Sequence, residues 1–399
     1  MKILLVIIDG LGDKPIPELG NKTPLEAAET PNLDWLAENG VCGLILPWHK
    51  KNDIPHSDTA HLALFGYNPK KYYLGRGVYE AAGIGVGLKK EDVALRVNFA
   101  TVDSDLKVID RRAGRIEKTE SLIRALQGKE FEGVKFIIEK SFGHRAVLIL
   151  RGKNLSAKIS DGDPHRVGVK VKKIRALNKS KQAKFTAEVL NKFLFEAHQV
   201  LKKHFLNKKR NNKGQLAANY LLVRGAGQFR RTLSFKQKYK LKSACIAGGK
   251  LYKGIGRILG MNLIKVKSAN GFVNTNLKGK FLAARNSLKK YDFVFLHIKA
   301  ADNLAEDGNF QGKKEFIEKI DKNLKPILNI KNVLVVITGD HSTCCGLKRH
   351  CLEPVPILIF GNGKDLVKKF SERDCKKGKL RKINQLNLMS EMLKLVYMA

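Results

Sequence analysis

No segment of the 399-residue chain is apolar over the ~20 residues that a membrane-spanning helix needs. Hydrophobic residues make up 43% of the sequence and charged residues 28%, which is typical of a globular protein. Met1 and Lys2 lead directly into an apolar run, and no small-residue cleavage site follows it. We therefore expect no signal peptide, no membrane partner and a cytoplasmic location.

Cysteine is also scarce, with six residues in the whole chain. So few cysteines in a chain of this length are not expected to form a disulfide framework. Three of them, Cys344, Cys345 and Cys351, flank His350 and suggest a thiolate zinc site as an alternative. Two adjacent cysteines lack the C-x-x-C spacing of a zinc knuckle, which counts against that interpretation.

Acidic residues are about half as common as basic ones, since 37 Asp and Glu stand against 75 Lys and Arg, a formal net charge of +38. Such a charge invites a nucleic-acid interpretation, but the lysines are spread along the chain and form only short clusters, as at residues 170–173 and 208–210. No DNA- or RNA-binding motif accompanies them. We expect no specific nucleic-acid partner, weak polyanion binding at low salt, and attraction of an anionic substrate.

The most informative segment that is present joins an apolar run to metal-type ligands. Residues 333–337 are all Val, Leu or Ile and predict a buried strand of a parallel sheet, and Asp340 and His341 follow it. Residues 3–8 repeat this pattern and are followed by Asp9. Because α/β proteins place their chemistry at the carboxyl ends of strands, the two segments predict one metal site assembled from both ends of the chain.

Further candidate ligands follow the same logic. Asp302 comes after a predicted strand that ends at residue 298, and His350 lies beyond Asp340. Ser57 stands in a turn before a helix-like run, where backbone N–H groups are suited to receive a phosphoryl oxygen. Each residue alone has an ordinary structural role, such as a turn or a helix cap. Their order along the chain is what indicates a functional site.

The pattern of predicted elements changes in the middle of the chain. Strand and helix signals alternate at both ends, whereas the middle carries short strands and one amphipathic helix at 183–206, followed by a charged loop at 207–214. Glycines between 75 and 87 predict a flexible passage. We predict an α/β fold in which a discontinuous metal-binding domain, residues 1–79 and 240–399, is interrupted by a smaller α+β domain, residues 80–239.

On these residues the chain resembles the alkaline phosphatase superfamily, and within it the archaeal type of 2,3-bisphosphoglycerate-independent phosphoglycerate mutases. The resemblance covers nearly the whole length. It rests on residues 4–10, 23–28, 30–34, 57–62, 66–69, 72–77, 98–103, 110–116, 297–302, 339–343, 350 and 354–356. It implies an alkaline-phosphatase-like three-layer sandwich with a mostly parallel sheet.

The resemblance also implies a two-metal site, with manganese as the expected ion and magnesium, cobalt or zinc as other possibilities. One metal would be bound by Asp9, Ser57, Asp340 and His341, and the other by Asp302, His350 and one further ligand. Ser57 would attack the phosphate of 3-phosphoglycerate and become a phosphoserine. The retained glycerate would then take the phosphoryl group back on its 2-hydroxyl. The implied protein is an isomerase of glycolysis and gluconeogenesis.

The inserted domain would bind this small phosphorylated hydroxy acid. Guanidinium groups suit bidentate contacts with carboxylates and phosphates. The substrate-binding residues that the resemblance implies are Arg111, Arg112, Arg115, Asp161, His165 and Arg224. Lys253 resembles the family lysine near the transferring phosphoryl group.

The chain departs from the family pattern at position 306. Glu306 stands where a histidine ligand is usual, and Asp307 follows it. A carboxylate in place of an imidazole shifts metal preference away from zinc and toward harder ions. Either Glu306 or Asp307 is the missing ligand, or this metal position is weakened. His56 also replaces a usual glycine beside Ser57, either as a proton-transfer group or as a tolerated loop residue.

Two other functions stay open at this point. One is a metal-dependent phosphomonoesterase of the same superfamily, in which water takes the phosphoryl group. The other is a degenerate, non-catalytic, anion-binding relative that has lost activity through the change at 306. The arginines of the insertion favour the mutase, because they could hold the intermediate. The oligomeric state is left open.

Overall fold

The computed structural model describes residues 1–50 and 53–397, and the chain divides into two compact units. Unit 1 contains Met1–Tyr73 and the chain from Thr232 onward, and unit 2 contains Leu74–Arg231. The sequence prediction placed the two boundaries after residues 79 and 239. Unit 2 is therefore an insertion in the sequence of unit 1.

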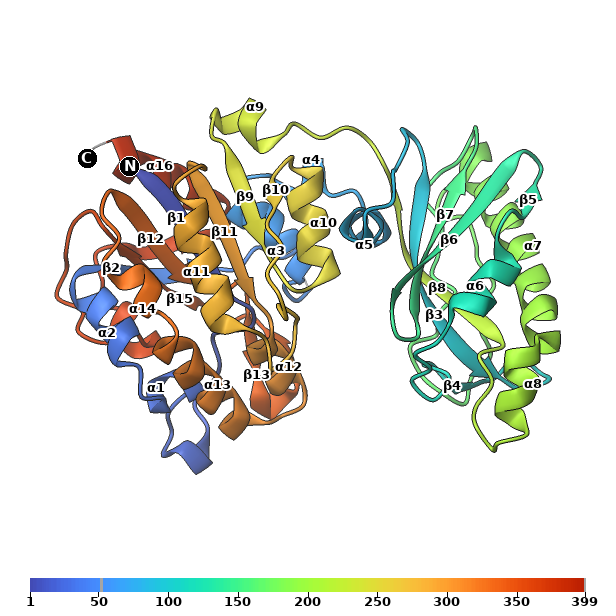
Figure 1. Ribbon diagram of the computed structural model, residues 1–399, viewed down its shortest axis with the longest axis horizontal. Helices are drawn as coiled ribbons and strands as arrows, with labels where there is room; N and C mark the ends of the chain where they lie inside the picture. The colour runs from blue at the N-terminus through green and yellow to red at the C-terminus, as the bar shows by residue number, and fades with distance from the viewer. Residues whose placement is uncertain (51–52, 398–399) are drawn as a thin grey trace. The chain divides into compact units, whose positions relative to one another are not determined.

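Unit 1 is built on an eight-stranded sheet (Figure 1). Its strands in spatial order are β10 (Asn262–Leu263), β9 (Ser243–Ile246), β11 (Phe293–Ile298), β1 (Lys2–Ile8), β12 (Val333–Thr338), β15 (Val355–Phe360), β2 (Gly40–Leu46) and β16 (Arg381–Asn384). Strand β1 pairs in parallel with β11 and β12, and only β15 runs against its neighbours. Nearly every residue of the three central strands is buried, as their continuous apolar sequences predict.

Two groups of helices form layers on the sheet (Figure 1). The first group contains, in order of contact, α11 (Leu277–Ser287), α14 (Lys325–Leu328), α2 (Pro31–Glu38), α13 (Phe310–Lys322) and α1 (Pro24–Ala27). The second contains α10 (Lys250–Ile258), α3 (Ser57–Leu64), the 3-10 turn η3 (Gln385–Asn387) and α16 (Leu388–Tyr397). The predicted α/β sandwich with a mostly parallel sheet is confirmed.

Shorter elements complete unit 1. They are η1 (Pro17–Leu19), α4 (Pro69–Tyr72), α9 (Phe235–Tyr239), α12 (Ala300–Glu306), β13 (Ser342–Cys344), η2 (Cys345–Leu347), β14 (Arg349–Cys351) and α15 (Glu372–Cys375). Strands β13 and β14 form a separate two-stranded hairpin. Local sequence explains the start of α1, because Thr23 and Glu26 form a reciprocal capping box and Pro24 occupies the first helical position.

Unit 2 is an antiparallel sheet packed against helices. Its strands are β3 (Val93–Val102), β4 (Val108–Asp110), β5 (Glu130–Phe131), β6 (Val134–Phe142), β7 (Arg145–Arg151) and β8 (Tyr220–Gln228). Helices α6 (Glu120–Leu126) and α7 (Lys181–Lys203) cover one face of this sheet (Figure 1). The core between them includes Phe136 of β6 stacked on Phe193 of α7, with ring centroids 4.3 Å apart.

Most of the glycine-rich passage forms a helix, which the sequence analysis did not predict. Helix α5 (Arg76–Ile84) runs through it and contacts β3 and β8. A Cβ on Gly77 would lie 2.1 Å from the backbone oxygen of Ala94 in β3. Glycine at this position lets the helix approach the strand closely, which composition alone does not reveal.

The predicted loop at 207–214 is also wrong in its first half, because α8 (Phe205–Asn211) occupies it. His204 leaves helical geometry with ψ 136°, which ends α7, and its ring accepts a hydrogen bond from the N–H of Leu206 to cap α8. The basic residues Lys208, Lys209 and Arg210 lie in the last turn, where they complement the helix dipole.

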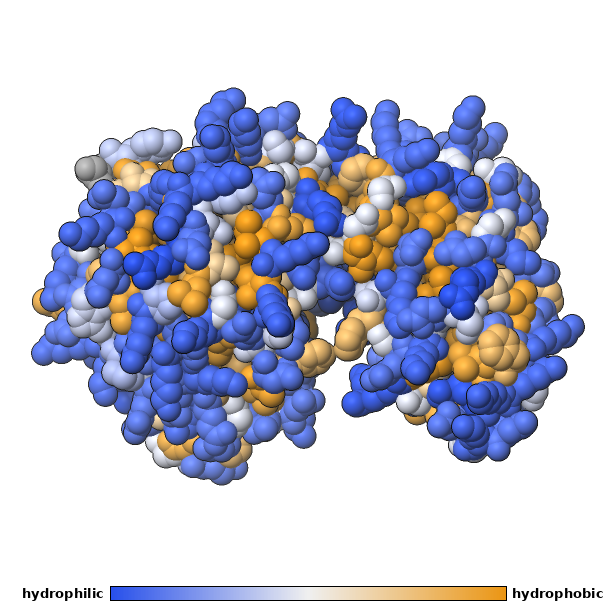
Figure 2. Space-filling view, viewed as in Figure 1, coloured by the Kyte–Doolittle hydropathy of each residue, from blue (hydrophilic) through white to orange (hydrophobic). Residues whose placement is uncertain are grey.

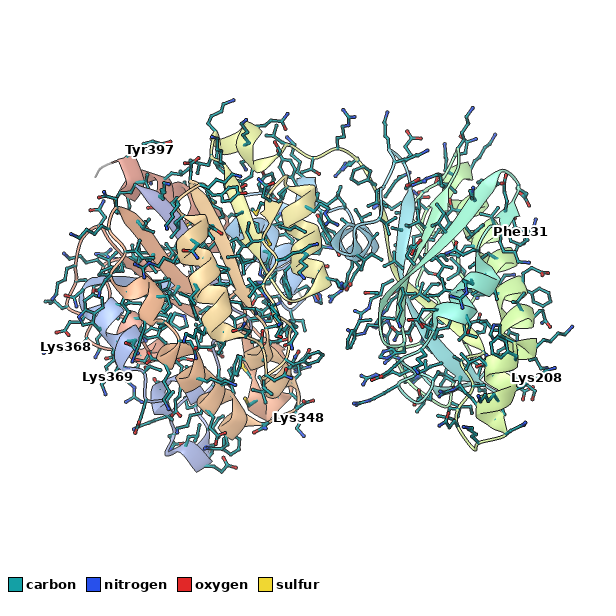
Figure 3. All side chains as sticks on the ribbon, viewed as in Figure 1. Phe131, Lys208, Lys348, Lys368, Lys369 and Tyr397 are labelled. Carbon is teal, nitrogen blue, oxygen red and sulfur yellow. A yellow bond between two sulfur atoms is a disulfide. The ribbon has the colours of Figure 1, made fainter. Side chains whose placement is uncertain are left out.

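The positive charge lies on the surface of both units. Figure 2 shows mainly hydrophilic side chains on the face in view. Lys208, Lys348, Lys368 and Lys369 are exposed and point outward from the ribbon (Figure 3). Among the described residues, no helix combines the length and apolarity required to cross a bilayer.

One buried ion pair joins three segments of unit 1. Lys313 of α13 is fully buried and donates to Asp13 Oδ2 at 2.9 Å and to the backbone oxygens of Gly12 and Thr343 at 3.0 Å each. Asp13 in turn accepts from the N–H of Cys345 at 3.0 Å. The pair therefore fixes the loop after β1 to the β13–β14 hairpin.

Lys313→Met should destabilise unit 1 by about 3–5 kcal/mol, because it leaves the buried charge of Asp13 without its partner. Urea unfolding followed by circular dichroism measures this change. Lys314→Met on the same helix is the matched control, since Lys314 forms a partly exposed ion pair with Glu318 at 2.8 Å and its loss should cost less than about 1 kcal/mol. Equal effects of the two substitutions would contradict the role of the buried pair.

Candidate metal centre

Three neighbouring strands deliver acidic side chains to one edge of the unit 1 sheet. Asp9 directly follows β1, and Asp340 follows β12 after one glycine. Asp302 lies in the first turn of α12, which follows β11. Because β11, β1 and β12 are adjacent and parallel, their carboxyl ends meet at the same edge. The predicted assembly of one site from both ends of the chain is what the topology produces.

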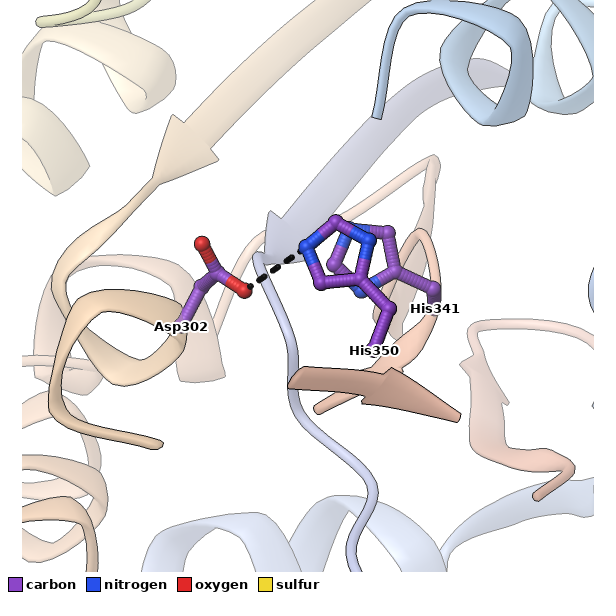
Figure 4. A group of neighbouring side chains, drawn as sticks. All are labelled: Asp302, His341 and His350. Carbon is purple, nitrogen blue, oxygen red and sulfur yellow. Dashed lines mark ion pairs between the residues drawn. The ribbon is translucent and has the colours of Figure 1, made fainter. Parts of the chain in front are cut away.

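The ligand-type side chains form two groups that share His341. Asp9, Asp340 and His341 form the first, and Asp302, His341 and His350 form the second, with the ligand atoms of each group within 4.8 Å of one another. The Nε2 atom of His341 lies 3.2 Å from Asp340 Oδ2 and 3.7 Å from Asp9 Oδ1. Figure 4 shows the imidazoles of His341 and His350 stacked, with His350 Nε2 3.5 Å from Asp302 Oδ1.

Ser57 joins this centre from the second helical layer. It is the first residue of α3 and is 6% exposed, and its Oγ lies 3.1 Å from His341 Nε2. The free N–H groups of the first helical turn surround a residue in this position. The structure thus brings together the predicted ligands Asp9, Ser57, Asp302, Asp340, His341 and His350.

Glu306, the position of the family departure, lies beside the second group. It is the last residue of α12, and its Oε1 is 3.8 Å from His350 Nε2. Burial and the nearby charge of Asp302 raise the pKa of Glu306 above its ordinary value. Asp307 follows the helix and forms no ion pair within the described part of the chain. Of the two carboxylates that the sequence left open, Glu306 is the one that faces the centre.

Sequence analysis missed the cation inside the centre. The ammonium of Lys299 lies 3.2 Å from Asp9 Oδ2 and 2.5 Å from Asp302 Oδ2. Burial disfavours its charge, but the two carboxylates outweigh this and raise the pKa of Lys299 well above its ordinary value. The sequence feature that could have identified Lys299 is its position directly after a buried strand and three residues before Asp302.

Three aromatic residues that line the centre were also missed. The hydroxyl of Tyr252 donates to Asp9 Oδ2, and its ring stacks on His297 with centroids 3.4 Å apart. His61 of α3 donates from Nδ1 to the backbone oxygen of Ser57 at 2.7 Å. Burial lowers the pKa of His61 to about 4 and that of His297 to about 3, so both imidazoles are neutral near pH 7.

The pKa values of Asp9 and Asp340 are shifted in opposite directions. Burial raises the pKa of Asp9, but Lys299 and His297 reverse the balance and hold it well below its ordinary value. The pKa of Asp340 rises well above its ordinary value, because burial and the charges of Asp9 and Asp302 disfavour a further anion. Asp9 and Asp302, whose pKa values are both lowered, are therefore the two anions that face the ammonium of Lys299.

The residues fit a divalent cation. Asp9 Oδ1 and Asp340 Oδ2 are buried, and neither has a hydrogen-bond partner among the described residues. Burial and His350 lower the pKa of His341 to about 3, which leaves its imidazole in the neutral form that binds metals. Buried, unpartnered carboxylate oxygens beside a neutral imidazole are the donor set of a metal site rather than of a packed core.

The hairpin that carries His350 contains a disulfide that the sequence did not predict. Cys344 of β13 is bonded to Cys351 of β14, and Cys345 is a free buried thiol. The sequence led us to expect no disulfide framework, and this single pairing was missed because the hairpin register brings the two strands side by side. Since two of the three thiols are consumed, the alternative of a thiolate zinc site is wrong.

The other predicted site residues are Lys253 of unit 1 and a group within unit 2. Lys253 follows Tyr252 on α10, and no hydrogen bond or ion pair joins it to the centre within the described residues. In unit 2, Arg111 binds Asp163 through two hydrogen bonds of 3.1 and 2.7 Å. Arg224 lies 3.6 Å from the same carboxylate and 3.4 Å from His165. Arg111, Arg224 and His165 therefore form one cluster around a buried aspartate.

The remaining predicted residues of unit 2 lie around that cluster or at the surface. Asp161 Oδ1 accepts from the N–H of Gly225 at 2.8 Å, and its Oδ2 lies 3.8 Å from His165 Nε2. Arg112 and Arg115 are exposed. Sequence analysis missed Arg96, whose pKa is lowered to about 9 by burial and whose positive charge adds to this part of unit 2.

Comparison with known proteins identifies the family. A model of the metalloenzyme superfamily matches residues 1–395. The 2,3-bisphosphoglycerate-independent phosphoglycerate mutase of Methanococcus aeolicus is 48% identical over 99% of this chain and 98% of its own. Mutase 1 of Archaeoglobus fulgidus is 46% identical over 100% of this chain and 99% of its own. The chain belongs to the 2,3-bisphosphoglycerate-independent phosphoglycerate mutase family. Phosphoglycerate mutases are isomerases.

Two solved structures extend the family likeness to the fold. The cofactor-independent phosphoglycerate mutase of Thermoplasma acidophilum has a TM-score of 0.71 and 37% identity, covering 99% of this chain and 100% of its own. A protein from Pyrococcus horikoshii has a TM-score of 0.86 and 36% identity, covering 100% of this chain and 98% of its own. The family resemblance inferred from the sequence is confirmed.

Glu306→His should raise the affinity of the second ligand group for Zn²⁺ relative to Mn²⁺, because an imidazole replaces a carboxylate 3.8 Å from His350. Competitive metal titration followed by elemental analysis measures this ratio. Asp307→Asn is the matched control, because it removes the neighbouring carboxylate, which forms no ion pair with the centre among the described residues. An unchanged ratio in Glu306→His would exclude Glu306 as a ligand.

Proposed function

We propose that this chain interconverts 3-phosphoglycerate and 2-phosphoglycerate by passing the phosphoryl group through Ser57. The observation that carries the proposal is the position of Ser57: a buried hydroxyl at a helix start, 3.1 Å from the histidine shared by both ligand groups. Full-length relatives named as phosphoglycerate mutases support the same reaction. This role in glycolysis and gluconeogenesis favours a cytoplasmic location.

We infer that the centre holds two divalent cations. One would be bound by Asp9, Ser57, Asp340 and His341, and the other by Asp302, Glu306 and His350. Carboxylate oxygens dominate this donor set, which favours Mn²⁺ or Mg²⁺ over Zn²⁺. When bound, the cations supply positive charge that stabilises the transferring phosphoryl group and the ionised form of the serine hydroxyl.

The protein residues carry the transfer in two balanced halves. In the first, Ser57 Oγ loses its proton and bonds to phosphorus, the bond from phosphorus to the 3-oxygen of glycerate breaks, and that oxygen gains a proton. In the second, the 2-hydroxyl of the retained glycerate loses its proton and attacks the phosphoserine, and Ser57 is released as the alcohol. The N–H groups of the first turn of α3 orient the phosphoryl oxygens in both halves.

Retention of glycerate is what separates a mutase from a phosphatase. The guanidinium groups of unit 2 offer planar donors for its carboxylate. The residues that we propose for substrate binding are Arg111, Arg112, Arg115, Asp161, His165 and Arg224. The formal net charge of +38 attracts the anionic substrate. Lys253 remains a candidate for contact with the phosphoryl group.

Ser57→Ala should abolish turnover while leaving the fold intact, because it removes the atom that receives the phosphoryl group. Turnover of 3-phosphoglycerate and thermal unfolding are measured together. Thr59→Ala is the matched control, since it removes a hydroxyl from the same helical turn whose hydrogen bond goes to the backbone of His56. Retained turnover in Ser57→Ala would remove this serine from the mechanism.

Arg112→Met should raise KM for 3-phosphoglycerate by about tenfold or more, because one charge-assisted hydrogen bond to substrate is worth about 1.5–3 kcal/mol. The stability of the protein should not change, since Arg112 is exposed. Arg124→Met, at an exposed arginine on α6 of the same unit, is the control. Normal kinetics of Arg112→Met would exclude this arginine from substrate binding.

A further inference from the structure

The hairpin β13–β14 connects the disulfide to the second ligand group. Its strands are three residues each, and Thr343 of β13 stands opposite His350 of β14 in the antiparallel register. The disulfide joins Cys344 to Cys351, with their Cα atoms 6.0 Å apart. His350 therefore lies directly before a cross-linked residue.

The two strands of this hairpin are anchored very differently. In β13, Thr343 donates from Oγ1 to Asp302 at 2.7 Å and from its N–H to the backbone oxygen of Gly12 at 3.0 Å. In β14, His350 donates from Nδ1 to the backbone oxygen of Pro55 at 2.7 Å, and its Nε2 lies 3.5 Å from Asp302 Oδ1. A two-stranded hairpin this short is marginal in water on its own. The covalent link adds to the backbone pairing of β14 with the anchored strand and to the hydrogen bond that Ser342 Oγ donates to the backbone oxygen of Glu353 at 2.9 Å.

We propose that Cys344 and Cys351 are positioning residues whose disulfide holds His350 against Asp302 and Glu306, so that the affinity of the second metal position depends on the redox state of these two cysteines. This inference rests on the two-metal centre of the proposed function. The first position is held without the link, because Asp9 and Asp340 follow central strands of the eight-stranded sheet and His341 directly precedes β13, the strand that Thr343 anchors to Asp302.

The second position is the one that needs such support. Its Glu306 side chain is 52% exposed, whereas the side chains of Asp9 and Asp340 in the first position are fully buried. Reduction of the disulfide by a dithiol or phosphine reductant breaks the S–S bond and places two electrons and two protons on the sulfur pair. Burial raises the pKa of the neighbouring Cys345 thiol to about 12, so its thiolate fraction is small near pH 7 and its exchange into the bond is slow.

Titration of the metal-free protein with Mn²⁺, followed by electron paramagnetic resonance, tests the proposal. Three samples are compared. They are the oxidised protein, the protein that has been reduced with a phosphine and then freed of the phosphine, and the double variant Cys344→Ser/Cys351→Ser. Both altered forms should bind one equivalent about 10–100-fold more weakly than the oxidised protein and the other equivalent unchanged. Cys375→Ser, which alters a free buried thiol elsewhere in unit 1, should match the oxidised protein.

The outcomes separate this inference from the proposed function. Equal affinities in all samples would overturn the role of the disulfide and leave the two-metal centre standing. Equal weakening of both equivalents, or general unfolding of the reduced protein, would also overturn it, because the link would then stabilise unit 1 as a whole. If the oxidised protein bound only one equivalent, the two-metal proposal itself would fail. If the double variant does not fold, the metal affinities of the reduced wild-type protein are compared with those of the oxidised protein instead.

Discussion

The mutual repulsion of three buried carboxylates is the constraint on which the rest of unit 1 depends. Asp9, Asp302 and Asp340 lie close together because the three parallel strands before them end side by side in the sheet. This topology fixes the three carboxylates near one another. Lys299 compensates part of the charge, and Asp340 responds with a raised pKa. A buried cluster with excess negative charge is costly unless further positive charge binds to it, and this requirement favours metal ions.

In unit 2, positive side chains surround a single buried carboxylate, which is the reverse of the arrangement in unit 1. The single carboxylate of Asp163 is buried, and although burial raises its pKa, the guanidinium groups of Arg111 and Arg224 outweigh this and lower it. Arg96 adds positive charge to the same part of the unit. The cluster therefore has excess positive charge and suits an organic anion. Unit 1 thus gathers buried carboxylates, and unit 2 gathers guanidinium groups around one buried carboxylate.

The sequence predicted those parts of the structure that local pattern determines. Continuous apolar runs identified the central strands, and Asp9, Asp340 and His341 followed from the ends of those runs. The sequence analysis did not identify Lys299 and Tyr252 as site residues, because their roles arise from packing between elements that are far apart in the chain. The glycines of α5 were read as flexible, although Gly77 serves a close contact with β3. The disulfide was not predicted, because the hairpin register that pairs its two cysteines cannot be deduced from their spacing in the sequence.

The measurement that tests the account most directly is turnover of 3-phosphoglycerate by metal-stripped protein resupplied with Mn²⁺. Formation of 2-phosphoglycerate is followed through enolase, and free phosphate is measured in the same samples. The account predicts 2-phosphoglycerate without release of phosphate, and no turnover before metal is added. Release of phosphate alone would contradict it and indicate a phosphatase, and no reaction with two metal equivalents bound would indicate that Glu306 marks the loss of this chemistry.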